Sequence, residues 1–502
     1  MLSHVPSATL LGVQGHPVRV EVHVSRGLPS LTVVGLPDVS CRESRDRVRA
    51  ATLSSGLEFP QQRVVVNLAP TDLRKVGSGL DLAIAVALLV ASKQVPAAAV
   101  EGLGFLGELG LDGTLRPVVG VLSLVDALEG SVPVVPVGNV EEARLVRGDT
   151  LTVRTLRDLV DVLRGEGSWA SPPPPDVVTP WCAPTVDLCE VQGHVMARAA
   201  LEVAAAGGHH VLMVGPPGSG KTMLADRLPT LLPDLTERDA LDVSRVHSAA
   251  ASFRAEFGLM HRPPLRAPHH TASLVALVGG GSSVMRPGEV SLASSGVLFL
   301  DELGEFPAGH LDALRQPLES GVMRVSRAAA NVTLPARFLL VAATNPCPCG
   351  VGKWGECRCA PAAIDRYARR LSGPLLDRFD IRLEIDPPDP DSVLHGGAGG
   401  ETSAQVRSRV AAARRRAADR GVGSNRELRG RALEQHAPLS PRAEELLRDR
   451  LRAGTISMRG AQRVRVLALT LGDLRGEDVP IAGDLVAEAL SLRGGERRVM
   501  AS

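Results

Sequence analysis

Residues 209–232 read HHVLMVGPPGSGKTMLADRLPTLL, and this stretch decides the fold. Four apolar residues at 211–214 predict a buried strand, and a glycine-rich turn follows them. The turn fits the pattern G-x-x-x-x-G-K-[ST], and the residues after it predict a helix. A strand–loop–helix unit of this kind turns backbone N–H groups and a helix N-terminus toward an anion. The sequence therefore predicts a phosphate-binding loop within an α/β domain.

Two residues of this loop carry the chemistry of phosphate binding. Lys221 would place a positive charge on the β- and γ-phosphates of a nucleotide, and Thr222 would ligate Mg²⁺. The chain has four lysines among 502 residues, so a lysine at the required position is improbable as a chance match. The sequence therefore predicts ATP and Mg²⁺ as cofactors.

Two further apolar segments end in residues that suit hydrolysis. Val297–Leu300 is followed by Asp301, which would hold Mg²⁺, and by Glu302, which would polarise the attacking water. Asn345 follows the segment LLVAAT and would orient water or sense the γ-phosphate, with a turn cap as the alternative. Parallel sheets bind ligands at the carboxyl ends of their strands. The residues predicted to bind the nucleotide and its metal are Gly215, Pro216, Pro217, Gly218, Ser219, Gly220, Lys221, Thr222, Met223 and Asp301.

The clearest boundary in the chain is the proline-rich stretch SWASPPPPDVVTPWCAP at 168–184. Proline fixes its own φ angle and donates no backbone hydrogen bond, so this stretch predicts an extended linker. It separates an N-terminal domain, 1–167, from a nucleotide-binding core, 185–395. The glycine-rich GGAGGE begins the last segment, 396–502, which is predicted to be helical and is rich in arginine.

The N-terminal domain has the pattern of a mixed α/β domain. Apolar and polar residues alternate at 16–27, which predicts a half-buried strand, and 30–36 is predicted to be its partner. The segment 63–70 predicts another strand, and 80–92 predicts a buried helix.

Charge is distributed unevenly along the chain. The formal net charge is +1, which gives no overall indication for or against nucleic acid. Residues 401–502 hold 20 arginines against 13 acidic residues, a net of +7, so the remainder has a net of −6. The basic end indicates either a polyanion contact or a solvated helical surface. Aromatic residues make up 2% of the chain, so backbone electrostatics is favoured over base stacking.

Four of the seven cysteines lie within thirteen residues, 347–359. Four thiolates can ligate tetrahedral Zn²⁺, although two C-x-C pairs are tighter than the usual spacing, and free thiols or an iron–sulfur cluster are the alternatives. The cysteines predicted to hold zinc are Cys347, Cys349, Cys357 and Cys359, and those predicted to be structural are Cys41, Cys182 and Cys189.

Cysteine usage and hydropathy also predict where the chain works. An odd, clustered cysteine count suits a reducing compartment better than a disulfide framework. The longest apolar run, 82–91, is far short of the roughly 20 residues that span a bilayer. The N-terminus has no signal-peptide pattern, so the prediction is a cytoplasmic protein without a membrane partner.

Several longer segments resemble one family in their order along the chain. These segments are GPPGSGKT, RAPHHTASLVALVGGG, PGEVSLASSGVLFLDELGEF, QPLESGVMRVSRA, ATNPCPCG and SGPLLDRFDI. They are similar to the ComM/YifB family of magnesium-chelatase-like AAA+ ATPases, and NLAPTDLRKVGSGLDLAIAVALL resembles that family's Lon-protease-like domain. The resemblance implies a Lon-like α+β domain, an AAA+ core with a five-stranded parallel sheet and a helical lid. It also implies a homo-oligomeric ring, typically a hexamer, that moves branch points in DNA.

The resemblance implies further roles for individual residues. Asn345 fits sensor 1, although Thr344 stands before it where Met is expected. Arg378, in LLDRFD, fits an arginine finger that reaches a neighbour's ATP, with a surface ion pair as the alternative. Arg459 resembles a sensor-2 arginine of the lid, and Arg463, one helical turn on, is its rival.

Two segments of the core are candidates for contact with DNA. GVMRVSRA, 321–328, alternates in polarity and predicts a hairpin that carries Arg324 and Arg327. By the resemblance, this hairpin points into the ring channel and grips phosphates without reading sequence. The histidine pair His269 and His270 lies in the second segment, which is interpreted as a polar insert loop.

Three other functions remain open at this point. The chain could be the ATPase subunit of a magnesium chelatase, or a regulatory ATPase without strand-separating activity. A protease would need a Ser–Lys pair, for which Ser78 and Lys93 are the candidates. The context of a Lon-type nucleophile is missing around Ser78, so a non-proteolytic scaffold is the prediction for this domain.

Overall fold

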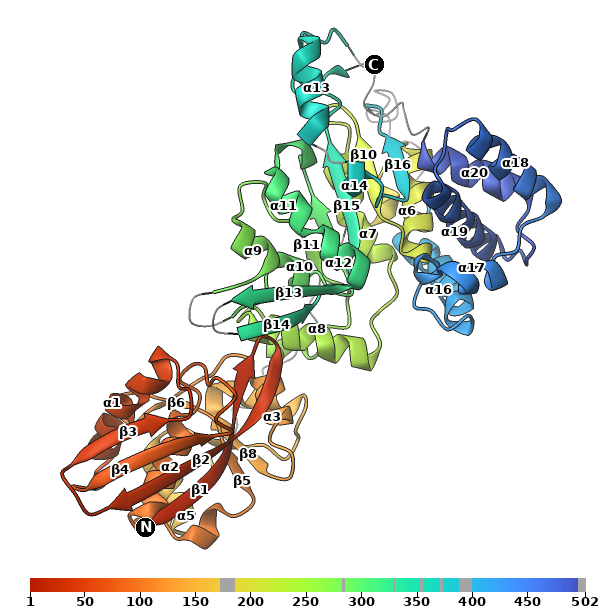
Figure 1. Ribbon diagram of the computed structural model, residues 1–502. Coiled ribbons are helices and arrows are strands. Elements are labelled where there is room, and N and C mark those ends of the chain that lie inside the picture. The colour runs from red at the N-terminus through yellow and green to blue at the C-terminus, as the bar shows by residue number, and fades with distance from the viewer. Residues whose placement is uncertain are drawn as a thin grey trace.

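The structure, a computed structural model, comprises an N-terminal domain, an α/β core and a helical lid (Figure 1). The described residues are 1–171, 186–281, 285–327, 330–352, 355–370, 373–387 and 400–494. Most of the predicted linker and of the predicted glycine-rich break therefore lies outside them. Trp169, which lies within the predicted linker, packs against the core of the N-terminal domain. In addition, the Ala170 N–H donates to the Thr152 carbonyl at 3.0 Å.

The N-terminal domain is mixed α/β, as predicted, and its main sheet has the strand order β1-β2-β4-β3. Its elements are β1 (Leu2–Leu11), β2 (Gln14–Ser25), β3 (Ser30–Val34), α1 (Val39–Ser54), β4 (Arg63–Ala69), α2 (Asp81–Ala91), β5 (Leu103–Phe105), β6 (Glu108–Leu109), β7 (Leu115–Arg116), α3 (Val121–Asp126), β8 (Val132–Pro136), α4 (Val140–Arg144), β9 (Leu151–Val153) and α5 (Leu156–Leu163). Helix α2 is buried along almost its whole length, because its apolar residues pack against the sheet.

The predicted pairing of the first strands is wrong. Strand β2 pairs with β1 on one side and with β4 on the other, and β3 pairs in parallel with β4. The connection from β3 to β4 runs through α1, so these elements form a crossover unit that covers the sheet with a helix. The predicted pairing of residues 16–27 with 30–36 is therefore replaced by the pairing of β3 with β4.

The core contains a five-stranded parallel sheet with the strand order β11-β12-β15-β10-β16, which confirms the predicted architecture. Its elements are α6 (Val195–Gly207), β10 (Val211–Val214), α7 (Lys221–Leu231), α8 (Glu237–Ala249), β11 (Leu265–Arg266), α9 (Leu274–Val278), α10 (Glu289–Leu292), β12 (Val297–Leu300), α11 (Ala308–Ala313), α12 (Arg315–Ser320), β13 (Val322–Arg327), β14 (Ala330–Pro335), β15 (Leu339–Thr344), α13 (Pro361–Arg370), α14 (Gly373–Leu376) and β16 (Ile381–Glu384).

Helices cover both faces of this sheet, which explains the unbroken apolar strands. Val211 and Met213 of β10 face one hydrophobic core, whereas Leu212 and Val214 face the other. A strand that is buried on both faces loses the apolar–polar alternation of a half-buried strand. The apolar run before the glycine loop is therefore a consequence of the two-sided burial.

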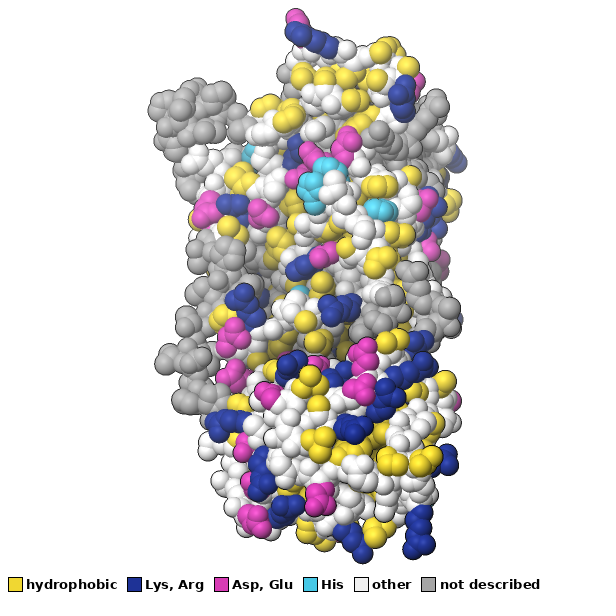
Figure 2. Space-filling model, turned by 90° about the vertical axis from the view of Figure 1, so that its left-hand side faces the viewer, with side chains coloured by type: hydrophobic (Ala, Val, Ile, Leu, Met, Phe, Trp, Pro, Cys, Tyr) yellow, Lys and Arg dark blue, Asp and Glu magenta, His cyan; other side chains and the backbone are white. Residues whose placement is uncertain are grey.

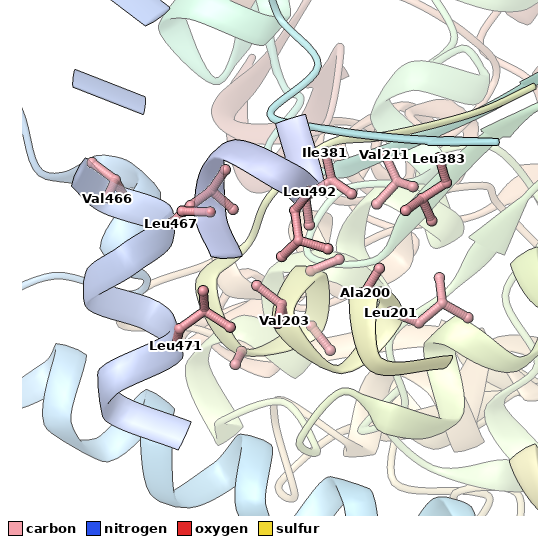
Figure 3. Packing of buried hydrophobic residues seen from close by; sticks show 14 of the residues in the cluster. Ala200, Leu201, Val203, Val211, Ile381, Leu383, Val466, Leu467, Leu471 and Leu492 are labelled. Atoms are coloured by element: carbon pink, nitrogen blue, oxygen red, sulfur yellow. The ribbon is translucent and has the colours of Figure 1, made fainter. Parts of the chain in front are cut away.

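The lid is helical and packs on the core through apolar side chains. Its helices are α16 (Ser403–Asp419), α17 (Gly430–His436), α18 (Pro441–Arg452), α19 (Met458–Arg475) and α20 (Gly483–Arg493). Figure 3 shows Leu467 and Leu471 of α19, with Leu492 of α20, beside Val203 of α6 and Ile381 of β16. This continuous core joins the lid to the sheet that carries the phosphate-binding loop.

The N-terminal domain contacts the core at the β1–β2 turn and at α8. Leu11 and Val13 of the turn pack against the core cluster that contains hairpin β13–β14. Gly12 has a φ of +66°, and a Cβ there would lie 2.3 Å from Val332 Cγ1, so the close approach requires glycine. Arg245 of α8 pairs with Asp126 at 2.9 Å. Within the described residues, no helix is long and apolar enough to cross a membrane.

Candidate functional site

The loop between β10 and α7 has the backbone geometry that the predicted phosphate-binding loop requires. Gly218 and Gly220 have φ angles of +76° and +82°, which glycine adopts without the steric cost that other residues incur. A Cβ at Gly215 would lie 2.3 Å from the Ile385 carbonyl oxygen, so this position also needs glycine. Helix α7 begins at Lys221, directly after Gly220, and its N-terminal N–H groups lie at the loop.

Lys221 lies inside this loop and is 9% exposed. Its Nζ donates to the carbonyl oxygens of Gly215 at 2.8 Å and Pro216 at 2.7 Å, and it lies 3.4 Å from Asn345 Oδ1. Burial lowers the pKa of Lys221, whereas the charge of Asp301 opposes that shift. A phosphate would replace weak carbonyl partners with anionic ones and so stabilise the ammonium group.

Asp301 and Glu302 follow β12, the strand two places from β10 in the sheet. Asp301 Oδ2 accepts a hydrogen bond from the Thr222 hydroxyl at 2.9 Å, which brings together the two predicted Mg²⁺ ligands. Glu302 has a φ of +52°, a left-handed backbone that is rare outside glycine, and its N–H donates to Asp301 Oδ1 at 2.9 Å. The Glu302 side chain is 53% exposed.

The sheet topology explains why these residues meet. Strands β10, β15 and β12 are neighbours and run in parallel, so their carboxyl ends share one edge of the sheet. Lys221 and Asn345 are 124 positions apart in sequence, yet their side chains lie within hydrogen-bond distance. The predicted cluster of Lys221, Thr222, Asp301 and Asn345 is therefore present as a spatial unit.

Sequence reasoning missed one neighbour of this cluster. His270 Nδ1 lies 3.0 Å from Glu302 Oε2, although the histidine pair was interpreted as part of a polar insert loop. The position of His270 could have indicated this contact. His270 follows β11 by four residues, and β11 pairs in parallel with β12, so the ends of both strands lie at the same edge of the sheet. In Figure 2, histidine and acidic side chains lie together on the upper half of the face shown.

The arginines implied by the resemblance lie in different settings. Arg378 is 7% exposed and forms an ion pair with Glu319 of α12. Arg459 is exposed in the first turn of α19. Its rival, Arg463, donates to Asp380 at 2.6 Å at the junction of lid and core, so it is engaged in a structural contact.

The predicted hairpin is present as β13 and β14, antiparallel and paired from Val322–Pro335 inward. Met323 and Val325 are buried against the core, whereas Arg324 is exposed between them. The side chain of Arg327 lies outside the part of the chain that the structure describes.

The four clustered cysteines converge in space. The Sγ atoms of Cys347 and Cys349 lie 3.3 Å apart, and Cys357 Sγ lies 3.7 Å from each of them. With Cys359, all four sulfur atoms lie within 4.8 Å of one another. Hydrogen bonds from the backbone N–H of Val351 and then from the thiols of Cys347 and Cys359 lower the pKa of Cys349 to about 6. Four thiolates at these separations are a donor set for one tetrahedral metal ion.

The cysteine loop touches the phosphate-binding loop. Gly350 lies in a left-handed conformation with a φ of +81°, and a Cβ there would come within 2.9 Å of Pro217 ring atoms. The turn that carries Cys347 and Cys349 is therefore packed against the nucleotide side of the core.

The Ser–Lys pair that a protease would need is not formed. Ser78 precedes α2 and donates to the Glu108 carboxylate, whereas Lys93 follows the other end of α2. An 11-residue helix is about 16 Å long, which is far beyond the reach of a proton transfer.

Three family models match successive parts of the chain. The model described as "Magnesium chelatase, subunit ChlI" matches residues 187–393, which include Lys221, Thr222, Asp301 and Asn345. "Subunit ChlI of Mg-chelatase" matches 20–136, and "Magnesium chelatase, subunit ChlI C-terminal" matches 400–493.

Relatives that match over the full length identify the family more specifically. An uncharacterised protein of Mycobacterium tuberculosis is 45% identical over 501 residues, which cover 98% of this chain and 99% of the relative. The uncharacterised protein YifB of Escherichia coli is 43% identical over 99% of this chain and 98% of its own length. The competence protein ComM of Haemophilus influenzae is 42% identical over 98% of this chain and 97% of its own length. The chain therefore belongs to the ComM/YifB family of magnesium-chelatase-like AAA+ ATPases.

Proposed function

We propose that this chain hydrolyses ATP at the cluster of Lys221, Thr222, Asp301, Glu302 and Asn345. The observation that carries the proposal is the convergence of these side chains at the carboxyl ends of three neighbouring parallel strands. Mg²⁺ bound with the nucleotide would neutralise the charge that develops on the transferred phosphoryl group.

Each residue of the cluster has a distinct task. Lys221 exchanges its carbonyl partners for the β- and γ-phosphate oxygens, and Thr222 and Asp301 hold the metal. Glu302 accepts the proton of the attacking water, and Asn345 orients that water against the γ-phosphate. Arg459 lies in the first turn of α19 and is our candidate for a lid contact with the nucleotide.

The active form is a homo-oligomeric ring, which we take to be a hexamer, with ATP between subunits. Arg378 acts in trans in this arrangement and stabilises the transition-state charge on a neighbour's nucleotide. Arg378 is paired with Glu319 within the chain, so this role requires the pair to open when the neighbour's nucleotide binds. The ring works in the cytoplasm.

The substrate of this motor is single-stranded or branched DNA, and its activity is branch migration or strand separation. Exposed Arg324, which stands on a hairpin held by buried apolar neighbours, supports a phosphate contact that does not read sequence. Arg327 belongs to the same proposed contact. A chelatase subunit and a regulatory ATPase are the alternatives, and comparison of ATPase rates with and without branched DNA separates them from the motor.

Substitution of Arg324 by alanine is expected to weaken DNA binding at every sequence tested. Loss of one phosphate contact lowers the slope of log K against log salt by about 0.7 for single strands and about 0.9 for duplexes. The measurement is a salt titration of affinity for single-stranded, duplex and branched DNA. Arg442→Ala, at an exposed arginine of α18, is the matched control. An unchanged slope would remove this hairpin from the DNA interface.

We further propose that Cys347, Cys349, Cys357 and Cys359 hold one Zn²⁺ ion. Sulfur atoms around tetrahedral zinc lie about 3.8 Å apart when the Zn–S distance is about 2.3 Å. The two 3.7 Å separations fit that geometry, and the 3.3 Å separation between Cys347 and Cys349 is shorter. Because this loop packs against Pro217, the metal would brace the wall of the nucleotide site.

Protein purified under reducing conditions without chelator is expected to contain about one zinc per chain. Replacement of both Cys357 and Cys359 by serine should abolish zinc binding, because two ligands cannot hold a structural ion. Cys189→Ser is the control, since Cys189 lies outside the cluster and is only partly buried. The measurement is the zinc content per chain of each protein. A zinc content near zero in the parent protein would contradict the proposal.

A further inference from the structure

The loop that follows β11 brings a histidine to the predicted general base. His270 Nδ1 lies 3.0 Å from Glu302 Oε2, and the two side chains come from neighbouring strand ends of the same sheet. The His270 side chain is 27% exposed, so part of it is shielded from water. This contact involves one of the two oxygens of the Glu302 carboxylate.

Two aromatic rings lie beside the His270 ring. The His269 ring lies 4.1 Å from it between centroids, tilted by 33°. On another side, Phe306 meets it edge-on at 6.4 Å, and Phe306 is 2% exposed within the core. His269 is itself bonded to Thr271 Oγ1 at 2.8 Å. These contacts restrict the orientation of the imidazole ring.

Glu302 needs such a partner because its side chain stays free to rotate although its backbone is constrained. The left-handed φ of +52° and the N–H bond to Asp301 fix the Cα, but the side chain is half exposed and has several rotatable bonds. General-base catalysis requires the carboxylate within hydrogen-bond reach of the reacting water. A donor at Nδ1 restricts the rotamers of Glu302 without accepting its proton.

We propose that His270 is a positioning residue for ATP hydrolysis and that its Nδ1–H holds the Glu302 carboxylate toward the attacking water. This inference rests on the proposed function, because it assigns a role only if Glu302 is the general base. Transition-state stabilisation, rather than nucleotide binding, then depends on His270.

The test compares steady-state ATPase kinetics of the parent protein with three substitutions at His270. His270→Ala should lower kcat about tenfold to a hundredfold with little change in KM, because the proposed hydrogen bond to the Glu302 carboxylate is lost. His270→Asn should recover most of the rate, because the asparagine amide can place a donor near the Nδ1 position. His270→Gln should not, since its amide reaches the Nε2 position instead. His261→Ala, at an exposed histidine earlier in the same segment, is the matched control.

A double-mutant comparison separates positioning from general damage. In the Glu302→Gln background, His270→Ala should have no further effect on the residual rate, because both act through one carboxylate. Additive losses, or an alanine variant with the parental kcat, would overturn the inference. A parent protein that hydrolyses no ATP would instead refute the proposed function itself. Thermal unfolding and binding of a fluorescent ATP analogue show whether each variant is folded.

Discussion

Replacement of Glu302 by glutamine is expected to lower ATP turnover by a factor of about 10²–10⁴. Glutamine keeps the shape of the side chain but cannot accept the proton of the attacking water. Lys221 and the Thr222–Asp301 pair are untouched, so the variant should still bind ATP with Mg²⁺. Single-turnover hydrolysis and equilibrium binding of ATP measure the two effects separately. A variant that hydrolyses at the parental rate would show that another group is the base.

The same variant tests whether the site is shared between subunits. Arg378→Ala alone should also be slow, because the finger on each neighbour is missing. In a mixed ring, a subunit with Arg378→Ala keeps its own Glu302 and receives the intact Arg378 of a neighbour with Glu302→Gln. Mixing the two inactive proteins should therefore restore part of the activity. If no mixture regains activity, Arg378 is not a residue that acts in trans.

Replacement of Asp380 by alanine is expected to destabilise the junction of lid and core by about 3–5 kcal/mol. Asp380 has a side chain that is 3% exposed, and it accepts from Arg463 at 2.6 Å and from Arg426 at 2.8 Å. Removal of the carboxylate leaves two largely buried guanidinium groups without their shared anion. Chemical denaturation measures the loss in the free energy of unfolding, and hydrogen exchange of the α19 amides shows whether the lid opens more often.

An exposed aspartate provides the control for this prediction. Asp478 is 95% exposed and lies 3.8 Å from Arg416, so Asp478→Ala should change stability by less than about 1 kcal/mol. Equal effects at the two positions would mean that the buried network does not hold the lid.

The same network makes stability depend on pH. Burial alone would raise the pKa of Asp380, but Arg426, His209 and Arg463 hold it well below the usual value. Because the folded pKa is depressed, the contribution is complete above the unfolded value of about 3.9 and is lost as pH falls below it. Burial also lowers the pKa values of His209 and His210, so their part of the acid loss begins near pH 6.5. Asp380→Asn should remove the carboxylate part, seen as a flatter stability profile below about pH 4.

Local patterns were sufficient to predict the phosphate-binding loop and the strand ends around it. The glycine loop, the lysine and the apolar strands can each be recognised in a short stretch of sequence. The turn needs glycines at fixed positions, and a strand that is buried on both faces needs consecutive apolar residues. The order of the parallel strands then brought Asp301 and Asn345 to the loop, as the resemblance implied. The clustering of Cys347–Cys359 was likewise visible from spacing. Cys347 and Cys357 are ten positions apart in sequence, and their Sγ atoms lie 3.7 Å apart.

The contacts that only the tertiary structure decided join distant segments. The partner of β3, the contact of His270 with Glu302, and the shared bonding of Asp380 by Arg426 and Arg463 have no local signature. The sequence around a polar loop residue does not show whether its side chain contacts solvent or a buried charge. Its partner is chosen by where the sheet and lid place the backbone, and by the free energy of leaving a buried charge unpaired.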